Sequence, residues 1–191
     1  MKIYKITEEP SLDYERISPV YGVSKTSGTN LAWSKALVKI SEDYYKNNDI
    51  LPVLVLESDA NQIRPFLDDY NLKFDIPQNC DILYYGVSAD TLGEKDRFSQ
   101  VEGYPHLVKL KIMASSHAVC FFNIQSVKKA LELVVAGLCS NIEKGGMPVD
   151  VMWSFELMPT LNAYALKNPL FVQGTSEEDN RYYKSTNIIL V

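Results

Sequence analysis

A strongly apolar stretch of the chain ends in two carboxylates. Residues 51–60 read LPVLVLESDA, and the apolar run from Val53 to Leu56 is followed by Glu57 and Asp59. Hard cations such as Mg²⁺ and Mn²⁺ prefer carboxylate oxygens and keep waters and substrate phosphates as their other ligands. We therefore interpret the two carboxylates as a candidate cation site that would neutralise a diphosphate leaving group. The alternatives that stay open are a solvated turn and a helix cap at Asp59.

Hydrophobic periodicity places this segment within an alternation of strands and helices. We expect strands at residues 2–6, 51–56, 81–86, 106–113, 117–124, 169–174 and 188–191, helices at 29–46, 61–73 and 126–144, loops at 7–28 and 87–105, and a short helix with a connector at 148–168. Thr29 or Asn30 is expected to cap the first helix, and Ser126 the third. The order predicts an α/β fold with a mostly parallel central sheet flanked by helices, in one domain of residues 1–191. Ligands of such sheets bind at the carboxyl ends of strands, where the two carboxylates lie.

The composition is that of a globular protein with an acidic balance. Apolar residues make up 46% of the chain, enough for a core, and the net charge of −5 is unlike that of a typical nucleic-acid-binding domain. Cys80, Cys120 and Cys139 are widely spaced without a CxxC motif, so we expect reduced, mostly buried thiols and no structural zinc. The N-terminus lacks the apolar region of a signal peptide, and no stretch reaches the roughly 20 apolar residues that span a bilayer. We therefore expect a cytoplasmic protein without membrane insertion.

Five short segments occur in an order typical of one enzyme family. They are VLVLESDA (53–60), CDILYYG (80–86), ASSHAVCFFNIQSVKKALEL (114–133), PVDVMW (148–153) and NPLFVQGTSEED (168–179). Together they resemble glycosyltransferase family 25, whose members transfer galactose or related sugars in lipopolysaccharide and collagen synthesis. The resemblance covers roughly residues 29–180. It implies a GT-A fold, a Rossmann-like α/β domain that binds a nucleotide-diphosphate sugar.

The resemblance also implies roles for individual residues. Glu57 and Asp59 match the family's metal and diphosphate motif, and would hold Mn²⁺ or Mg²⁺. Asp150 matches a late aspartate that would orient or deprotonate the acceptor hydroxyl, as an inverting transfer requires. His117 matches the histidine of the third motif, and would bind the metal or a phosphate. The alternative, purely structural interpretations are a helix cap for Asp150 and a structural histidine at a strand start for His117.

The donor side departs from the family pattern. Ser58 stands where the family's acidic motif usually has an aspartate. In the first helix Ser34 is kept, but Lys35 replaces the usual histidine and the Gly-Cys pair is missing. Arg16 is the nearest match to an early arginine element. From the positions that remain, we expect Arg16, Ser34 and Lys35 to contact the nucleotide sugar, with Lys25 as a further phosphate partner.

Three interpretations of the function remain. The first is a metal-dependent glycosyltransferase whose acceptor is a glycan, or a hydroxymethylated DNA base as in small viral enzymes; a DNA acceptor would need a flipped base. The second is a GT-A-like binding or interaction module without catalysis, which Ser58 and the missing Gly-Cys pair suggest. The third is an unrelated α/β nucleotide-binding domain, although the sequence has no GxGxxG or GxxxxGK[ST] loop to support it.

Overall fold

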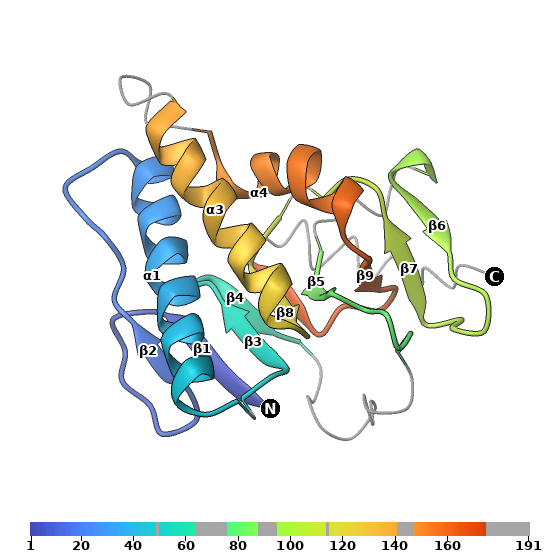
Figure 1. The fold of residues 1–191 in the computed structure, drawn as a ribbon, viewed down its shortest axis with the longest axis horizontal. Coiled ribbons are helices and arrows are strands. Elements are labelled where there is room, and N and C mark those ends of the chain that lie inside the picture. Colours follow the sequence, from blue (N-terminus) through green and yellow to red (C-terminus); the bar gives the residue numbers. More distant parts are fainter. Residues whose placement is uncertain (49, 64–75, 88–94, 114, 141–146, 175–191) are drawn as a thin grey trace.

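The computed structural model describes residues 1–48, 50–63, 76–87, 95–113, 115–140 and 147–174. They contain an eight-stranded sheet, shown with its helices in Figure 1. The strand order is β2 (Glu15–Ile17), β1 (Lys2–Ile6), β3 (Val53–Leu56), β8 (Ala118–Phe121), β5 (Ile82–Gly86), β9 (Ala163–Leu166), β7 (Leu107–Leu110) and β6 (Phe98–Gln100). Six of these eight strands run in one direction, and β7 and β8 run in the other. The predicted α/β class with a mostly parallel sheet is confirmed.

The described helices pack on one face of this sheet (Figure 1). They are α1 (Lys25–Lys46), α3 (Ile124–Ser140) and α4 (Val149–Met152), which continues into a π-helical turn at Trp153–Leu157 and a 3₁₀ turn at Met158–Thr160. Along β3, Val53 and Val55 contribute to the core under the helices, and Leu54 and Leu56 to a second core on the opposite face. The unbroken apolar run of β3 therefore reflects burial on both faces of the sheet.

A charged cluster fixes the end of α1 against the start of β1. Asp43 accepts hydrogen bonds from Lys2 Nζ at 2.7 Å, Tyr4 Oη at 2.8 Å and Lys39 Nζ at 2.8 Å. Burial disfavours the charge of Asp43, but these donors outweigh it and hold the pKa of that carboxyl well below its usual range. Because the cluster locks the far end of α1, the opposite end of the helix is held over the carboxyl ends of β1 and β3.

The first turn of α1 begins earlier than predicted. Ser24 caps it, because its Oγ accepts the backbone N–H of Ser27 at 3.2 Å. Thr29 and Asn30, the predicted caps, lie inside the helix. Helix α3 is likewise capped by Asn123, whose Oδ1 accepts the N–H of Ser126 at 2.8 Å, so the prediction of a Ser126 cap was also wrong.

Several short strands escaped the sequence prediction. Strands β2 and β6 lie in segments expected to be loops, and β9 lies in the expected connector. Residues 60–62 form β4 (Ala60–Gln62), which pairs with β10 (Phe171–Gln173) as a separate antiparallel ribbon, where the start of a helix was expected. A strand of three or four residues is too short for an alternation of apolar and polar residues to be recognised in the sequence. Features predicted at 64–73, 88–94, 141–144 and 188–191 lie outside the described residues.

The structure bears on the expected burial of the cysteines and on the expected lack of a membrane-spanning segment. Cys80 and Cys120 are free and buried, whereas Cys139 is free and exposed. No helix within the described ranges combines the length and the apolar character needed to cross a bilayer.

Candidate functional site

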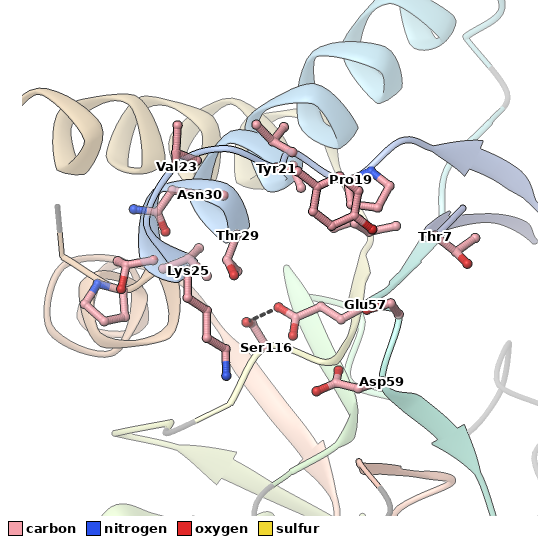
Figure 2. A pocket seen from close by; sticks show the side chains of 18 of the residues that line it. Thr7, Pro19, Tyr21, Val23, Lys25, Thr29, Asn30, Glu57, Asp59 and Ser116 are labelled. Atoms are coloured by element: carbon pink, nitrogen blue, oxygen red, sulfur yellow. Dashed lines mark hydrogen bonds between the residues drawn. The ribbon is translucent and has the colours of Figure 1, made fainter. Parts of the chain in front are cut away.

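A cavity of about 820 Å³ opens at the carboxyl ends of β1 and β3. Its wall combines the segment after β1, the loop and first turns of α1, the carboxylates after β3, and the start of α4 (Figure 2). Ser115 and Ser116, which precede the reversed strand β8, lie at the same edge of the sheet and complete the wall with Gln173. The site is therefore where a parallel α/β sheet is expected to bind its ligand.

Glu57 lies at the floor of this cavity between α1 and β8. Its Oε1 accepts two hydrogen bonds, from Trp33 Nε1 at 2.6 Å and from Ser116 Oγ at 2.7 Å. Burial raises the pKa of Glu57, the two donors oppose that rise, and the nearby charges of Asp59 and Asp150 add to it. The net direction is upward, so the structure holds this carboxylate at a cost that a bound cation would offset.

Asp59 is held by the β4–β10 ribbon. Gln173 Nε2 donates to Asp59 Oδ2 at 3.3 Å, and the backbone N–H of Gly174 donates to Asp59 O at 2.8 Å. The other carboxylate oxygen, Oδ1, is buried and has no hydrogen-bond partner among the described residues. An unsatisfied buried carboxylate oxygen costs free energy, so Oδ1 fits a ligand that brings positive charge.

The pair of carboxylates fits a hard cation that takes part of its ligands from elsewhere. Within the described ranges, no group of three or more His, Cys, Asp or Glu side chains is arranged to hold an ion. A site on Glu57 and Asp59 would therefore leave most coordination positions to water and to ligand oxygens, which is the usual arrangement for Mg²⁺.

Asp150 enters the cavity from the first turn of α4. Its Oδ1 accepts the backbone N–H of Val151 at 2.9 Å, and the residue is half-buried. Burial raises the pKa of Asp150, which moves this carboxylate toward the range of a general base. The predicted base and the predicted cation pair thus line one cavity, although they are more than 90 residues apart in the sequence.

The cavity wall is strongly acidic. Five of its residues carry carboxylates, namely Glu8, Glu9, Glu57, Asp59 and Asp150, and the only Lys or Arg among its described residues is Lys25. Lys25 extends from the start of α1, opposite Asp59 in Figure 2. The N-terminal end of α1, with its partial positive charge, lies on the same side as Lys25.

Three predicted ligand contacts lie outside this wall. Arg16 is exposed on β2 and donates from Nη1 to Glu8 O at 3.3 Å. Ser34 donates to Asn30 O at 2.9 Å within its own helix, and Lys35 is exposed. Because the cavity faces the first turns of α1, these side chains are not brought together with Glu57 and Asp59.

His117 is fully buried and has a structural setting. Its Nδ1 contacts Ser115 Oγ, and its Nε2 lies 3.3 Å from Phe171 O. The ring packs over Gly86, where an added Cβ would overlap His117 Nε2 and lie 2.8 Å from Phe171 O. His117 therefore joins β8, β5 and β10 behind the cavity wall, and it is not among the lining residues.

Sequence reasoning missed four polar groups that shape the cavity. Trp33 and Ser116 bind Glu57, Gln173 binds Asp59, and Asn30 donates from Nδ2 to Met147 O at 2.8 Å, which ties α1 to the segment before α4. Asn30 Oδ1 is buried without a partner among the described residues. Gln173 and Ser116 stand inside quoted motifs, but nothing in the sequence indicates which carboxylate each would contact.

No protein-family model and no curated protein sequence matches the chain. Among solved structures, it is similar to a glycosyltransferase involved in the glycosylation of the major capsid of PBCV-1, with 11% identity, a TM-score of 0.51, and coverage of 96% of this chain and 97% of that one. A CTP:phosphocholine cytidylyltransferase from Streptococcus pneumoniae aligns at 11% identity with a TM-score of 0.42, over 82% of this chain and 62% of that one. A nucleoside-diphosphate-sugar pyrophosphorylase from Vibrio cholerae RC9 aligns at 14% identity with a TM-score of 0.44, over 90% of this chain and 70% of that one.

The first of these likenesses concerns the fold. Nearly the whole of both chains takes part in it, so the α/β architecture described above is that of a GT-A-like domain. Membership of glycosyltransferase family 25 stays a prediction from the five motifs.

Proposed function

We propose that the chain is a metal-dependent glycosyltransferase that uses a nucleotide-diphosphate sugar. The observation that carries the proposal is the acidic cavity at the carboxyl ends of β1 and β3, which holds Glu57, Asp59 and Asp150 together. The GT-A-like fold, shared with a glycosyltransferase, supports it. So does the volume of about 820 Å³, which lies within the range of small-molecule sites.

The charge of the cavity explains why a cation is part of the proposal. A nucleotide diphosphate is itself negative, and the described residues of the cavity wall would offer it five carboxylates and one ammonium, that of Lys25. When bound, Mn²⁺ or Mg²⁺ would neutralise the diphosphate leaving group. Glu57 and Asp59 would hold it, and Lys25 with the start of α1 would meet phosphate oxygens from the opposite side.

Asp150 is the proposed general base. Its carboxylate would accept the proton of the acceptor hydroxyl as that oxygen attacks the anomeric carbon from the face opposite the diphosphate, which inverts the configuration. The acidic wall favours a glycan hydroxyl over a hydroxymethylated DNA base, because DNA phosphates would be repelled at the cavity mouth.

A thermal-shift titration tests the donor half of this proposal. The protein is titrated with UDP, GDP and CMP and with their sugars, with and without Mn²⁺. A ligand at a hundred times its Kd adds about 2.7 kcal/mol to the free energy of unfolding. We expect one nucleotide to stabilise the protein only when Mn²⁺ is present, and Asp59→Ala to abolish that shift.

Asp13→Ala serves as the matched control, because Asp13 is an exposed carboxylate away from the cavity. Release of the nucleotide from the stabilising sugar nucleotide then separates an enzyme from a binding module: a transferase hydrolyses its donor slowly, and a module does not. The absence of any metal-dependent shift across the whole panel would contradict the proposal.

A further inference from the structure

The two carboxylates of the candidate cation site are held by different parts of the fold. Glu57 is fixed by α1 and by the start of β8, through Trp33 and Ser116. Among the described residues, Asp59 is held by the end of β10, through the backbone of Gly174 and the side chain of Gln173. The geometry of the pair therefore depends on a ribbon that lies outside the eight-stranded sheet.

The amide of Gln173 has a defined orientation. Its Nε2 faces Asp59 Oδ2 at 3.3 Å, and its Oε1 lies 3.4 Å from the hydroxyl of the buried Ser115. A flipped amide would place its oxygen against the Asp59 carboxylate, where both atoms would be acceptors. His117, whose Nδ1 contacts the Ser115 hydroxyl, meets Phe171 O, two residues before Gln173 on the same strand.

The two carboxylate oxygens of Asp59 differ in their hydrogen bonding, and this difference indicates a role for Gln173. Gln173 engages only Oδ2, and Oδ1 is buried with no partner among the described residues, although the Asp59 residue lines the cavity. A side chain that merely capped a turn would satisfy both oxygens or expose them to water. Here one oxygen accepts a hydrogen bond from Gln173, and the other has no partner among the described residues.

We propose that Gln173 is a positioning residue for cation binding: it fixes the carboxylate of Asp59 by one oxygen so that the other is presented to a divalent cation. The proposal rests on the cation site of the proposed function. Hydrogen-bond partners behind metal ligands orient those ligands, and their loss typically lowers metal affinity by about 10- to 100-fold. Because the contact is made by a neutral amide at 3.3 Å, we expect an effect near the lower limit, about 10-fold.

The test is Mn²⁺ binding to the full chain, measured by calorimetry and by the loss of the free-ion paramagnetic resonance signal, without any nucleotide. Gln173→Met keeps the length of the side chain and removes both polar groups. Asn61→Ala is the matched control, because Asn61 Nδ2 donates to Gly174 O at 2.7 Å in the same ribbon and its side chain does not line the cavity. Urea unfolding without metal reports whether each variant folds.

We expect Gln173→Met to raise the Kd for Mn²⁺ about 10-fold and Asn61→Ala to leave it within twofold of the wild-type value. Should Gln173→Met fail to fold, Ser115→Ala replaces it, with an expected weakening of about threefold because Gln173 then loses only its Oε1 partner.

The outcomes separate this inference from the function on which it rests. If the wild type binds Mn²⁺ and a folded Gln173→Met protein binds it with the same Kd, the positioning role is overturned and the cation site is left intact. An equal loss in Asn61→Ala would also overturn it, since ribbon stability would then explain both. No Mn²⁺ binding by the wild type would overturn the cation site itself.

Discussion

Replacing Ser116 by alanine removes one of the two donors that hold the Glu57 carboxylate. Ser116 is 5% exposed, and its hydroxyl lies 2.7 Å from Glu57 Oε1. A hydrogen bond to a charged group contributes about 1.5–3 kcal/mol, and the substitution leaves almost no cavity because one oxygen atom is lost. We expect Ser116→Ala to lower the free energy of unfolding by about 2 kcal/mol near pH 8.

The loss should depend on pH in a direction that the structure fixes. Donation from Ser116 favours the ionised form of Glu57 and therefore opposes the rise in its pKa. Without that donor the pKa of Glu57 rises further, so the variant is penalised most where Glu57 is ionised. As the pH falls and Glu57 is protonated, the difference between wild type and variant should shrink.

Urea unfolding at pH 5 and pH 8 measures this difference, and Ser34→Ala is the matched control. Ser34 Oγ donates to Asn30 O within its own helix, so alanine there should change stability by less than about 0.5 kcal/mol. In a double-mutant cycle, Glu57→Gln keeps an acceptor oxygen but removes the charge, so Ser116→Ala in that background should cost only the roughly 0.5–1.5 kcal/mol of a neutral hydrogen bond and should not depend on pH. A Ser116→Ala loss that is independent of pH, or no larger than that of Ser34→Ala, would refute the assigned hydrogen bond.

Three further outcomes follow from the packing and charges. Gly86→Ala should lower the free energy of unfolding by about 1–3 kcal/mol, since its Cβ would overlap the ring of His117; a melting temperature equal to wild type would contradict this. Asp43→Asn should lower the free energy of unfolding by about 2 kcal/mol at pH 7. The loss should be smaller as the pH falls below about 4, because a lowered pKa means that Asp43 stabilises the fold in its ionised form. Urea unfolding at pH 3 and 7 measures the difference. Lys25→Ala should weaken nucleotide binding in the thermal-shift assay at least about threefold, whereas Lys35→Ala, outside the cavity, should not; equal effects would place the phosphates elsewhere.

The sequence was sufficient to predict at which edge of the sheet Glu57 and Asp59 lie. A buried strand must end at an edge of its sheet, and charged residues directly after it must lie at that edge, which places Glu57 and Asp59 without further information. Asp150 came from a motif, and its position in the same cavity follows from the packing of α4 beside α1. That Glu57 and Asp59 bind a cation, and that Asp150 acts as a base, stay predictions.

The ligand contacts predicted on α1 and at the start of β8 depend on details of the tertiary structure that the sequence does not give. A helix presents a new side chain every 100° or so, and a shift of its start from residue 29 to Lys25 changes which turn lines the cavity. Ser34 and Lys35 therefore fall beyond the cavity, and Lys25 falls within it. His117 has the residue type of a ligand, but only the tertiary structure shows that it packs against Gly86 and Phe171.

The environment of Glu57 leads to one more expectation, in which stability and function oppose each other. Burial raises the pKa of Glu57 although Trp33 and Ser116 both donate to it, so the folded state is penalised whenever this carboxylate is ionised. For a carboxyl group whose folded pKa is raised, stability falls as the pH rises from the unfolded pKa through the folded pKa. Glu57→Gln keeps an oxygen for both donors and removes the charge. We therefore expect it to stabilise the metal-free protein at pH 8, to have little effect near pH 4, and to abolish stabilisation by Mn²⁺.

Urea unfolding at the two pH values, followed by a Mn²⁺ thermal shift at pH 8, measures both halves of this expectation. A Glu57→Gln protein that is less stable than wild type at pH 8 would show that the donors fully compensate for burial, and the carboxylate would then need no cation. A variant that is more stable but still responds to Mn²⁺ would assign the ion to Asp59 and other groups. A gain in stability together with the loss of the metal response is the result expected of a residue retained for binding at the expense of the fold.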